Sequence, residues 1–321
     1  RSPAGRRHHY TAGAEAMSAK TLPGKDAIKT KGWLRAHQWL LLRRAVQLSI
    51  LALFLAGPVA GVWIVKGNLT SSLTLGVLPL SDPFVLLQSL LAGHIAAGTA
   101  LLGAAIVLGF YLLVGGRTYC SFVCPMNIVT DTAQWLSRRL DLAKGWRPAR
   151  QTRLWALGAV LVTALVTGTM AWELLNPVTL LHRGLVYGMG WLWTVVAAIF
   201  LFDLVVSNRG WCGHLCPMGA FYGLLGRASV ARVSAKNRRA CNDCMDCFAV
   251  CPEPHVITPA LRGANTQTGP VILSGDCTNC GRCIDVCAKD VFKFDVRFNN
   301  VLPDDEGQDK NSGVSSDRRA A

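Results

Sequence analysis

The chain has 321 residues, 51% of them hydrophobic, and a mean hydropathy of +0.32. This composition excludes an ordinary soluble domain and favours a protein with membrane spans. The formal net charge of +14 would also suit a nucleic-acid-binding protein. However, the basic residues flank apolar stretches and form no single stripe with interleaved aromatic residues, so nucleic-acid binding is disfavoured.

The chain begins with a basic segment, residues 1–44, which we expect to lie in the cytoplasm. Residues 1–16 are polar and irregular, and Met17 is a candidate natural start, which would make 1–16 a non-native extension. Four apolar stretches follow, each long enough to cross about 30 Å of hydrocarbon at about 1.5 Å per residue. The predicted spans cover residues 45–65, 84–114, 154–175 and 189–207.

Lys and Arg residues gather on one side of these spans. They crowd the first segment and the loop between the second and third spans, whereas the loops after the first and third spans carry almost none. The positive-inside rule then places both termini in the cytoplasm. Because cytoplasmic thiols stay reduced, the 12 cysteines predict metal sites and not disulfides.

The predicted membrane domain, residues 45–228, contains an internal repeat. Ser-Asp-Pro at 81–83 precedes the second span, and Leu-Asn-Pro at 175–177 precedes the fourth. After each span the chain reads Arg-x-aromatic-Cys-x3-Cys-Pro-Met, starting at Arg117 and at Arg209. We therefore predict two repeated helical hairpins, which would bring the two cysteine motifs together at the cytoplasmic face.

These motifs supply four cysteines, here named the thiol quartet: Cys120, Cys124, Cys212 and Cys216. In an α-helix, a spacing of four residues puts both thiols of a pair on one face. Four converging thiolates could bind a metal ion, copper included, or a further iron–sulfur centre. Small packing residues at a tight turn are the alternative explanation.

The remaining eight cysteines lie in residues 229–300, in two runs with the spacing C-x2-C-x2-C-x3-C, which is typical of bacterial two-[4Fe–4S] ferredoxins. In that arrangement the fourth cysteine of each run binds the other cluster. Zinc is the alternative, but its sites usually show two separate C-x2-C pairs. The predicted ligands of cluster one are Cys241, Cys244, Cys247 and Cys287, and those of cluster two are Cys251, Cys277, Cys280 and Cys283.

The predicted fold class is therefore an all-α membrane domain of four transmembrane helices plus a small α+β ferredoxin-like domain. The polar tail, residues 301–321, is expected to be disordered. The sequence contains no G-x-G-x-x-G fingerprint and no P-loop, so it predicts no flavin, nicotinamide or nucleotide site.

After Met17, nearly the whole chain resembles the NapH-type membrane subunit of the quinol dehydrogenase that serves periplasmic nitrate reductase. The resemblance is carried by residues 31–35, 81–83, 93–94, 119–125, 210–217 and, most specifically, 241–256. It implies four spans, a cytoplasmic two-cluster domain and a periplasmic ferredoxin-type partner subunit. It further implies that electrons pass from quinol towards the periplasmic reductase, through that partner and a membrane-anchored multihaem cytochrome.

Quinol oxidation releases two protons and so needs nearby bases. Ionisable groups at membrane depth are functional candidates, and His94, Glu173 and His182 are the predicted quinol-site residues. The alternative is a histidine hydrogen-bonded between helices or a carboxylate at the membrane surface.

The leading hypothesis is an electron-transfer subunit of a quinol dehydrogenase, not a complete enzyme by itself. One alternative is a factor that handles copper or iron through the thiol quartet for assembly of a respiratory reductase. Another is a ferredoxin of the methylamine-utilisation type, which is similar in size. A docking scaffold with structural clusters is a further alternative.

Overall fold

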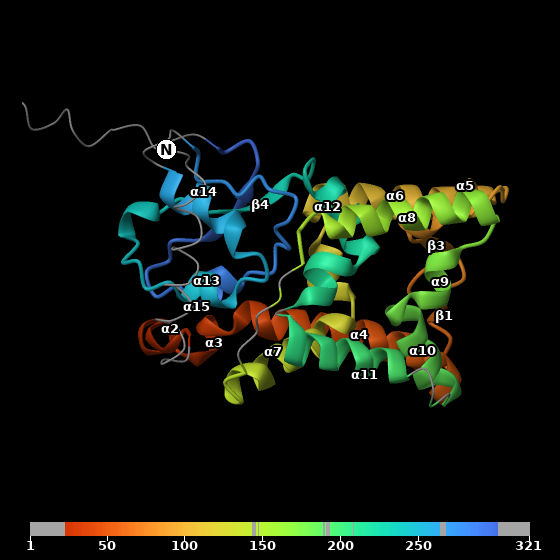
Figure 1. Cartoon of the computed structure of the whole chain (residues 1–321), viewed down its shortest axis with the longest axis horizontal. Helices are drawn as coiled ribbons and strands as arrows, with labels where there is room; N and C mark the ends of the chain where they lie inside the picture. Colours follow the sequence, from red (N-terminus) through yellow and green to blue (C-terminus); the bar gives the residue numbers. More distant parts are fainter. Residues whose placement is uncertain are drawn as a thin grey trace, which may run out of the picture.

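The computed structural model describes residues 23–142, 146, 148–188, 190, 193–207, 209–263 and 268–300. The expectations for residues 1–16 and for the 301–321 tail lie outside these residues. Within them, a helical part lies beside a smaller part that is built on a two-stranded sheet (Figure 1).

The first three helices are α2 (Lys25–Lys31), α3 (Trp33–Ala36) and α4 (Gln38–Ala60). α4 begins before the predicted first span because its first turns pack on protein, where Arg43 and Gln47 are buried. It ends at Gly61, whose φ of 71° is the left-handed conformation that favours glycine. Among the described residues, α4 is the one helix that is long and apolar enough to cross a membrane.

The other apolar helices are shorter than predicted. The span predicted at 84–114 is divided into α5 (Pro83–Leu91) and α6 (Gly98–Val114), and that at 154–175 into α8 (Thr152–Thr167) and α9 (Ala171–Leu175). In place of 189–207 the structure has α11 (Trp193–Leu201) and the π-helical turn η4 (Phe202–Val206). The prediction of a continuous helix over 84–114 is therefore wrong, and four transmembrane helices are not confirmed in the described residues.

Backbone geometry explains the broken second span. Gly93 has a φ of 82°, so the chain turns between α5 and α6, and the two helices pack together. Before α5, three antiparallel strands form a meander in which Ser72 lies opposite Leu80: β1 (Val65–Gly67), β2 (Ser71–Thr74) and β3 (Leu78–Ser81). β3 packs along α6, and a Cβ at Gly103 would lie 2.9 Å from the carbonyl oxygen of Pro79.

The two halves of the helical part have the same order of elements. α5 and α10 (Pro177–Tyr187) both begin with Pro after a capping side chain, Asp82 or Asn176, that accepts a backbone N–H bond. An apolar helix follows in each half, and then a π-helical turn, η2 (Tyr119–Val123) or η5 (Trp211–Leu215). α7 (Met126–Arg139) closes the first half and α12 (Pro217–Gly226) the second.

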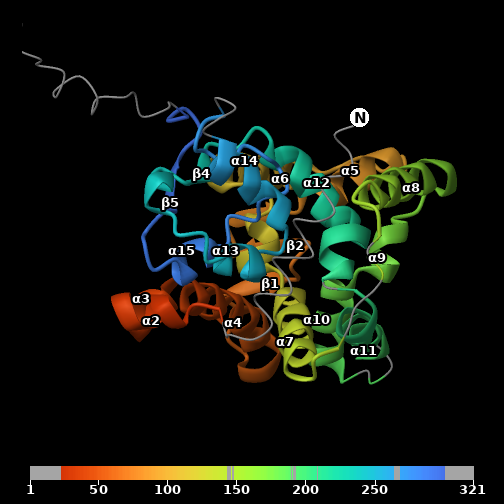
Figure 2. The same cartoon turned by 60° about the vertical axis from the view of Figure 1, so that its left-hand side comes forward.

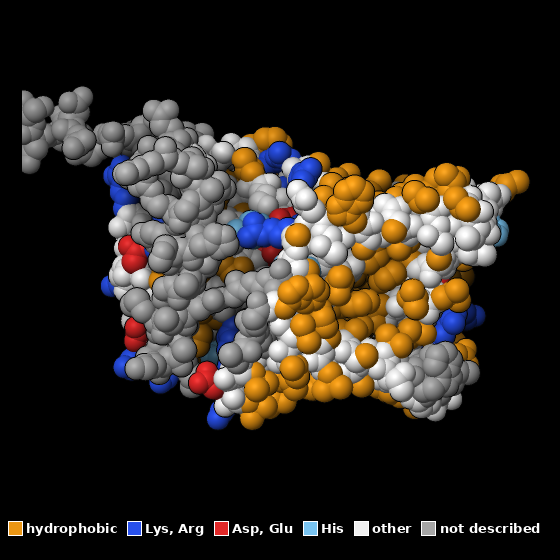
Figure 3. All heavy atoms as spheres, viewed as in Figure 1, with side chains coloured by type: hydrophobic (Ala, Val, Ile, Leu, Met, Phe, Trp, Pro, Cys, Tyr) orange, Lys and Arg blue, Asp and Glu red, His pale blue; other side chains and the backbone are white. Residues whose placement is uncertain are grey.

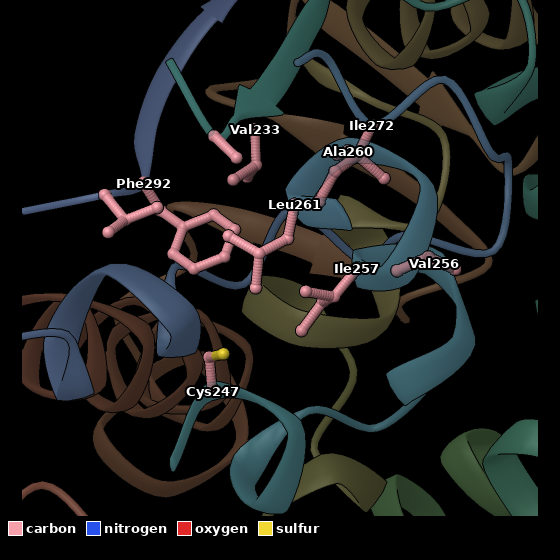
Figure 4. Close-up of a cluster of buried hydrophobic side chains, with 10 residues drawn as sticks. Val233, Cys247, Val256, Ile257, Ala260, Leu261, Ile272 and Phe292 are labelled. Atoms are coloured by element: carbon pink, nitrogen blue, oxygen red, sulfur yellow. The ribbon is translucent and has the colours of Figure 1, made fainter. Parts of the chain in front are cut away.

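The smaller part is an α+β unit, as predicted. β4 (Ala231–Ser234) pairs antiparallel with β5 (Lys293–Val296). Between these strands lie short helices and turns: η6 (Arg238–Ala240), α13 (Asp246–Val250), η7 (Pro254–Val256), α14 (Ile257–Arg262) and α15 (Arg282–Val286). Val233, Ile257, Leu261 and Phe292 lie in its apolar core, and the side chain of Cys247 lies at the edge (Figure 4).

The N-terminal helices hold this smaller part in place. α2, α3 and α4 all pack on α15, as Figure 2 shows from the side. The carboxylate of Asp285 accepts hydrogen bonds from the backbone N–H groups of Trp39 at 3.1 Å and Leu40 at 3.0 Å. A residue of the smaller part therefore caps the start of α4.

Large apolar side chains are exposed over the helical part (Figure 3). Leu113 of α6 is 62% exposed, and Trp155 and Val166 of α8 are 77% and 78% exposed. An apolar surface of this extent is suited to contact with lipid or with a protein partner.

Candidate iron–sulfur sites

Two cavities in the smaller part are each lined by one of the two predicted sets of four cysteines. The first is lined by Cys241, Cys244, Cys247 and Cys287, and the second by Cys251, Cys277, Cys280 and Cys283. In each cavity three ligands come from one run and the fourth from the other run. The structure thus brings together the eight cysteines in the crossed arrangement predicted from the sequence.

The backbone of the two runs has the same local shape. In the first run Asp243 and Met245 have positive φ angles of 54° and 65°, and in the second run Asn279 and Gly281 have 47° and 71°. These are the second and fourth residues after the first cysteine of each run. Left-handed residues are uncommon outside glycine, so their repetition indicates that both loops wrap around the same kind of group.

The surroundings of the sulfurs fit an iron–sulfur cluster. Burial raises the pKa of the Cys247 thiol to about 12 and that of Cys277 to about 11. Free thiolates would therefore be unstable here, and the positive charge of bound iron would stabilise them. The backbone N–H of Asp243 also donates to the sulfur of Cys241 at 3.4 Å, the type of bond that tunes cluster potentials.

A single metal ion fits these sites less well. No group of three or more His, Cys, Asp or Glu side chains in the described part of the chain is arranged to hold one ion. A cluster of four irons keeps its thiolates farther apart than one ion does. The lining of each cavity by four cysteines from two crossed runs favours an iron–sulfur cluster over zinc there.

The thiol quartet lies where the two repeats meet. Cys120 lies in η2 and Cys212 in η5, and Cys124 and Cys216 end these turns. Both segments are π-helical and not α-helical, a form often found at functional sites. Burial raises the pKa of the Cys124 thiol, and the nearby thiols of Cys120 and Cys216 raise it further. Cys212 is affected by the other three in the same way.

A buried arginine joins the thiol quartet to the second cavity. The guanidinium of Arg117 donates to the carbonyl oxygen of Cys212 at 3.2 Å and to that of Asp276, the residue before Cys277, at 2.8 Å. It also hydrogen-bonds the thiol of Cys120. Arg117 is 2% exposed, so these contacts are shielded from water.

The positive charge of Arg117 is balanced by carboxylates that lie between the thiol quartet and the second cavity. Its guanidinium lies 3.1 Å from the carboxylate of Glu253, which Arg153 also approaches at 3.4 Å. Arg153 further pairs with Asp276. Burial alone would raise the pKa of Asp276, but a hydrogen bond with His255 and the charges of Arg153 and Arg117 hold that pKa well below its usual range.

A second ionic cluster lies around Asp131 of α7. Its carboxylate pairs with Arg209 at 2.7 Å, with Arg282 of α15 at 2.6 Å and with Arg44 of α4. One carboxylate therefore ties the second repeat, the smaller part and the N-terminal helix to the first repeat.

The three predicted quinol-site residues lie in different local surroundings, and their role stays a prediction. His94 lies exposed in the turn between α5 and α6. His182 of α10 is buried against the ring of Phe54, with ring centroids 5.8 Å apart. The carboxylate of Glu173 accepts hydrogen bonds from the hydroxyl of Thr179 at 2.8 Å and the amide of Asn176 at 3.4 Å.

The ionic residues that connect the sites were not among the residues predicted from the sequence. Arg117 and Arg209 are the shared arginines of the two repeats, and Glu253 follows the Cys-Pro of the first run. These positions were visible as parts of motifs. Their partners Asp131, Arg153 and Asp276 carry no local signal, because the pairs form only between distant segments.

The fold and the cysteine-lined cavities define an electron-transfer protein of the two-cluster ferredoxin class. Residues 240–291 match the family model described as a 4Fe-4S dicluster domain. A second model, described as a 4Fe-4S binding domain, matches twice, at residues 96–142 and 189–237. The double match follows the two repeats, and each copy includes one pair of the thiol quartet.

Similar proteins cover most of the chain. The methylamine utilization ferredoxin-type protein MauN of Methylorubrum extorquens is 55% identical over 278 residues, 87% of this chain and 96% of the relative. MauN of Paracoccus denitrificans is 58% identical over 251 residues, 78% of this chain and 88% of the relative. The ferredoxin-type protein NapH of Escherichia coli is 49% identical over 278 residues, 86% of this chain and 96% of the relative.

The chain therefore belongs to the family of ferredoxin-type proteins that includes NapH and MauN, and it is an electron-transfer protein. The resemblance to NapH-type proteins noted from the sequence is confirmed. No solved structure matches the chain.

Proposed function

We propose that this protein is the membrane subunit of a quinol dehydrogenase. It would take electrons from quinol and transfer them between the thiol quartet and the two-cluster domain. Iron–sulfur clusters held by the eight ferredoxin cysteines, and a further centre held by the quartet, would supply one-electron transfer. The contacts of Arg117 carry the proposal. One guanidinium touches the peptide of Cys212 in the quartet and the peptide next to Cys277 in the second cavity.

The order of the sites follows from these contacts. The quartet touches the second cavity through Arg117, and the second cavity lies beside the first because their ligands come from crossed runs. In the first cavity Cys244 is exposed, so this site reaches the surface of the smaller part. The sites thus form a line from the helical part to the surface of the smaller part.

The proposed setting is the bacterial inner membrane. We propose a multi-pass topology in which both termini and the two clusters lie in the cytoplasm, on the basis of the distribution of Lys and Arg. α4 and the exposed apolar side chains of α6 and α8 support a place in lipid. The proposed partners are a periplasmic ferredoxin-type subunit and a membrane-anchored multihaem cytochrome, which would carry electrons towards periplasmic nitrate reductase.

The comparisons also support a second pathway that the transferred electrons could serve. The two MauN proteins are 55% and 58% identical to the chain, against 49% for NapH of Escherichia coli. We therefore propose methylamine utilisation as the alternative pathway for the same electron transfer. If the protein serves methylamine utilisation, a strain lacking this gene would lose growth on methylamine. If it serves nitrate reductase, the strain would lose nitrate respiration.

The electron-transfer proposal is tested by adding menaquinol or ubiquinol to the anaerobically purified full-length protein in lipid discs. EPR and optical spectra should show reduction of the clusters. The Cys120→Ser variant should lose reduction by quinol, while dithionite still reduces the two ferredoxin clusters. Cys244→Ser is the matched control, since it should disturb only the first cavity. Wild-type clusters that dithionite reduces and quinol does not would refute the proposal.

A further inference from the structure

Two structurally equivalent helix starts differ in charge. Asp82 caps α5 and Asn176 caps α10, and each accepts a bond from the backbone N–H two residues later, at 2.7 Å and 3.1 Å. Asn and Asp cap helices about equally well, as the second repeat shows. The negative charge of Asp82 is therefore not needed for the cap, although the residue is only 5% exposed and burial of a charge is costly.

The second carboxylate oxygen of Asp82 has a specific partner. It accepts a hydrogen bond from the hydroxyl of Tyr222 in α12, at 3.1 Å. Tyr222 is fully buried and stacks on Tyr119, with ring centroids 4.9 Å apart and planes at 13°. The ring of Tyr111 meets Tyr222 edge-on at 5.1 Å. The carboxylate thus lies at one end of a group of three tyrosines.

The thiol quartet lies against the apolar cluster that contains these tyrosines. Cys120, Cys124 and Cys216 all pack against the cluster formed by these tyrosines, Phe84 and Trp172. In the same cluster the hydroxyl of Tyr119 and the indole N–H of Trp172 are buried without a hydrogen-bond partner. Buried polar atoms are nearly always paired, so these two atoms indicate a polar group or a ligand that binds in this cluster, and Tyr119 directly precedes Cys120 of the quartet.

We infer that Asp82 is a proton acceptor for quinol oxidation beside the thiol quartet and that the hydroxyl of Tyr222 relays the proton; this inference rests on the proposed function. In the step, one O–H bond of the quinol breaks, and an iron–sulfur centre held by the quartet would accept one electron. The released proton binds the oxygen of Tyr222, whose own proton forms a new O–H bond on the carboxylate of Asp82. Glu173 lies within electrostatic reach of Asp82 and is half-buried, on the way to the surface.

The test compares two electron donors on the full-length protein in lipid discs. Quinol gives up protons with its electrons, whereas reduced methyl viologen gives up electrons alone. Asp82→Asn keeps the cap and should slow cluster reduction by quinol about 100-fold, the usual contribution of a positioned base, with no change for viologen. Tyr222→Phe should also slow the quinol reaction alone. Tyr111→Phe is the matched control, because it removes a hydroxyl from the same cluster without touching Asp82.

Infrared difference spectra provide a readout independent of rate. Reduction of the wild type by quinol should produce the band of a protonated carboxyl group, which Asp82→Asn should abolish and Tyr111→Phe should retain. Quinol reduction of Asp82→Asn at the wild-type rate would overturn the inference, and so would equal slowing with both donors. If quinol fails to reduce even the wild type, while viologen succeeds, the proposed function itself fails and the inference falls with it.

Discussion

At the scale of single residues, the arrangement depends on a few buried arginines. Arg117 and Arg209 occupy the same position in the two repeats, yet they have different partners: Glu253 for Arg117 and Asp131 for Arg209. A buried guanidinium is tolerated only when it is paired and hydrogen-bonded. Each arginine therefore fixes the segment that supplies its carboxylate, and Arg117 fixes the ferredoxin part against the quartet.

Arg117→Met should reveal how much this contact stabilises the protein. Removing one partner of a buried ion pair typically lowers the free energy of unfolding by about 3–5 kcal/mol, and Glu253 would keep Arg153 and the nearby His255. We expect earlier loss of cluster absorbance in thermal melts of the variant. The double variant with Glu253→Gln should lose less than the sum of the two single variants, because the two residues interact. Strictly additive effects would show that the pair contributes nothing.

At the scale of elements, close packing of β3 on α6 decides the shape of the first repeat. Gly103 lies at the contact, while Gly109 of the same helix has no atom within 4 Å of the position that a Cβ would take. The two glycines are alike in sequence context. The contact with β3 makes glycine necessary at position 103, whereas no described residue makes such a contact at position 109.

Substitution by alanine should separate these two glycines. Gly103→Ala would push a methyl group against the backbone of Pro79, and overpacking of this kind costs about 1–3 kcal/mol. Gly109→Ala should be neutral or stabilise the helix by up to about 1 kcal/mol. Melting temperatures of the two variants in the same detergent would check this, and an equal shift in both would contradict the packing of β3 on α6.

At the scale of the whole molecule, ionic clusters join parts that are distant in sequence. Asp131 and the pair Glu253 and Asp276 connect the N-terminal helix, both repeats and the ferredoxin part. The sites for electron transfer lie on either side of these connections. Conditions that neutralise these carboxylates should therefore weaken the contact between the smaller, ferredoxin-like part and the helical part.

The pH dependence of Asp276 gives one such test. Its pKa is lower in the folded state than in the unfolded state, so its stabilising effect is present above its unfolded pKa of about 3.9 and is lost as the pH falls through the lower folded value. Asp276→Asn should destabilise the protein by about 2 kcal/mol at pH 7, and the difference from wild type should shrink below about pH 4. Thermal melts at several pH values would measure it.

Asp290→Asn is the control for this series. Asp290 pairs with Lys31 at the surface, where its side chain is 73% exposed. Exposed pairs contribute about 0–1 kcal/mol, so this variant should melt close to the wild type at every pH. A difference between wild type and Asp276→Asn that stays constant down to pH 3 would contradict the assigned pKa.

The sequence by itself determined the cysteine chemistry and the repeat. Iron–sulfur ligation depends on spacing within short runs, so two sets of four candidate ligands could be predicted from the sequence, and each cavity is lined by one of these sets. The repeat was visible because both copies keep the same residues around Arg117 and Arg209. Hydropathy located the apolar stretches but not the points where their helices end. The turn at Gly93 and the contact of β3 with α6 depend on packing, which hydropathy does not describe.

Only the tertiary structure decided which groups act together. It joined the quartet to the second cavity through Arg117 and placed Asp82 against Tyr222. Residues 140 positions apart, as in that last pair, leave no local pattern in the chain. The physical reason is that burial and pairing of charges are set by neighbours in space, whereas the ligand spacing of a cluster is set by neighbours in sequence.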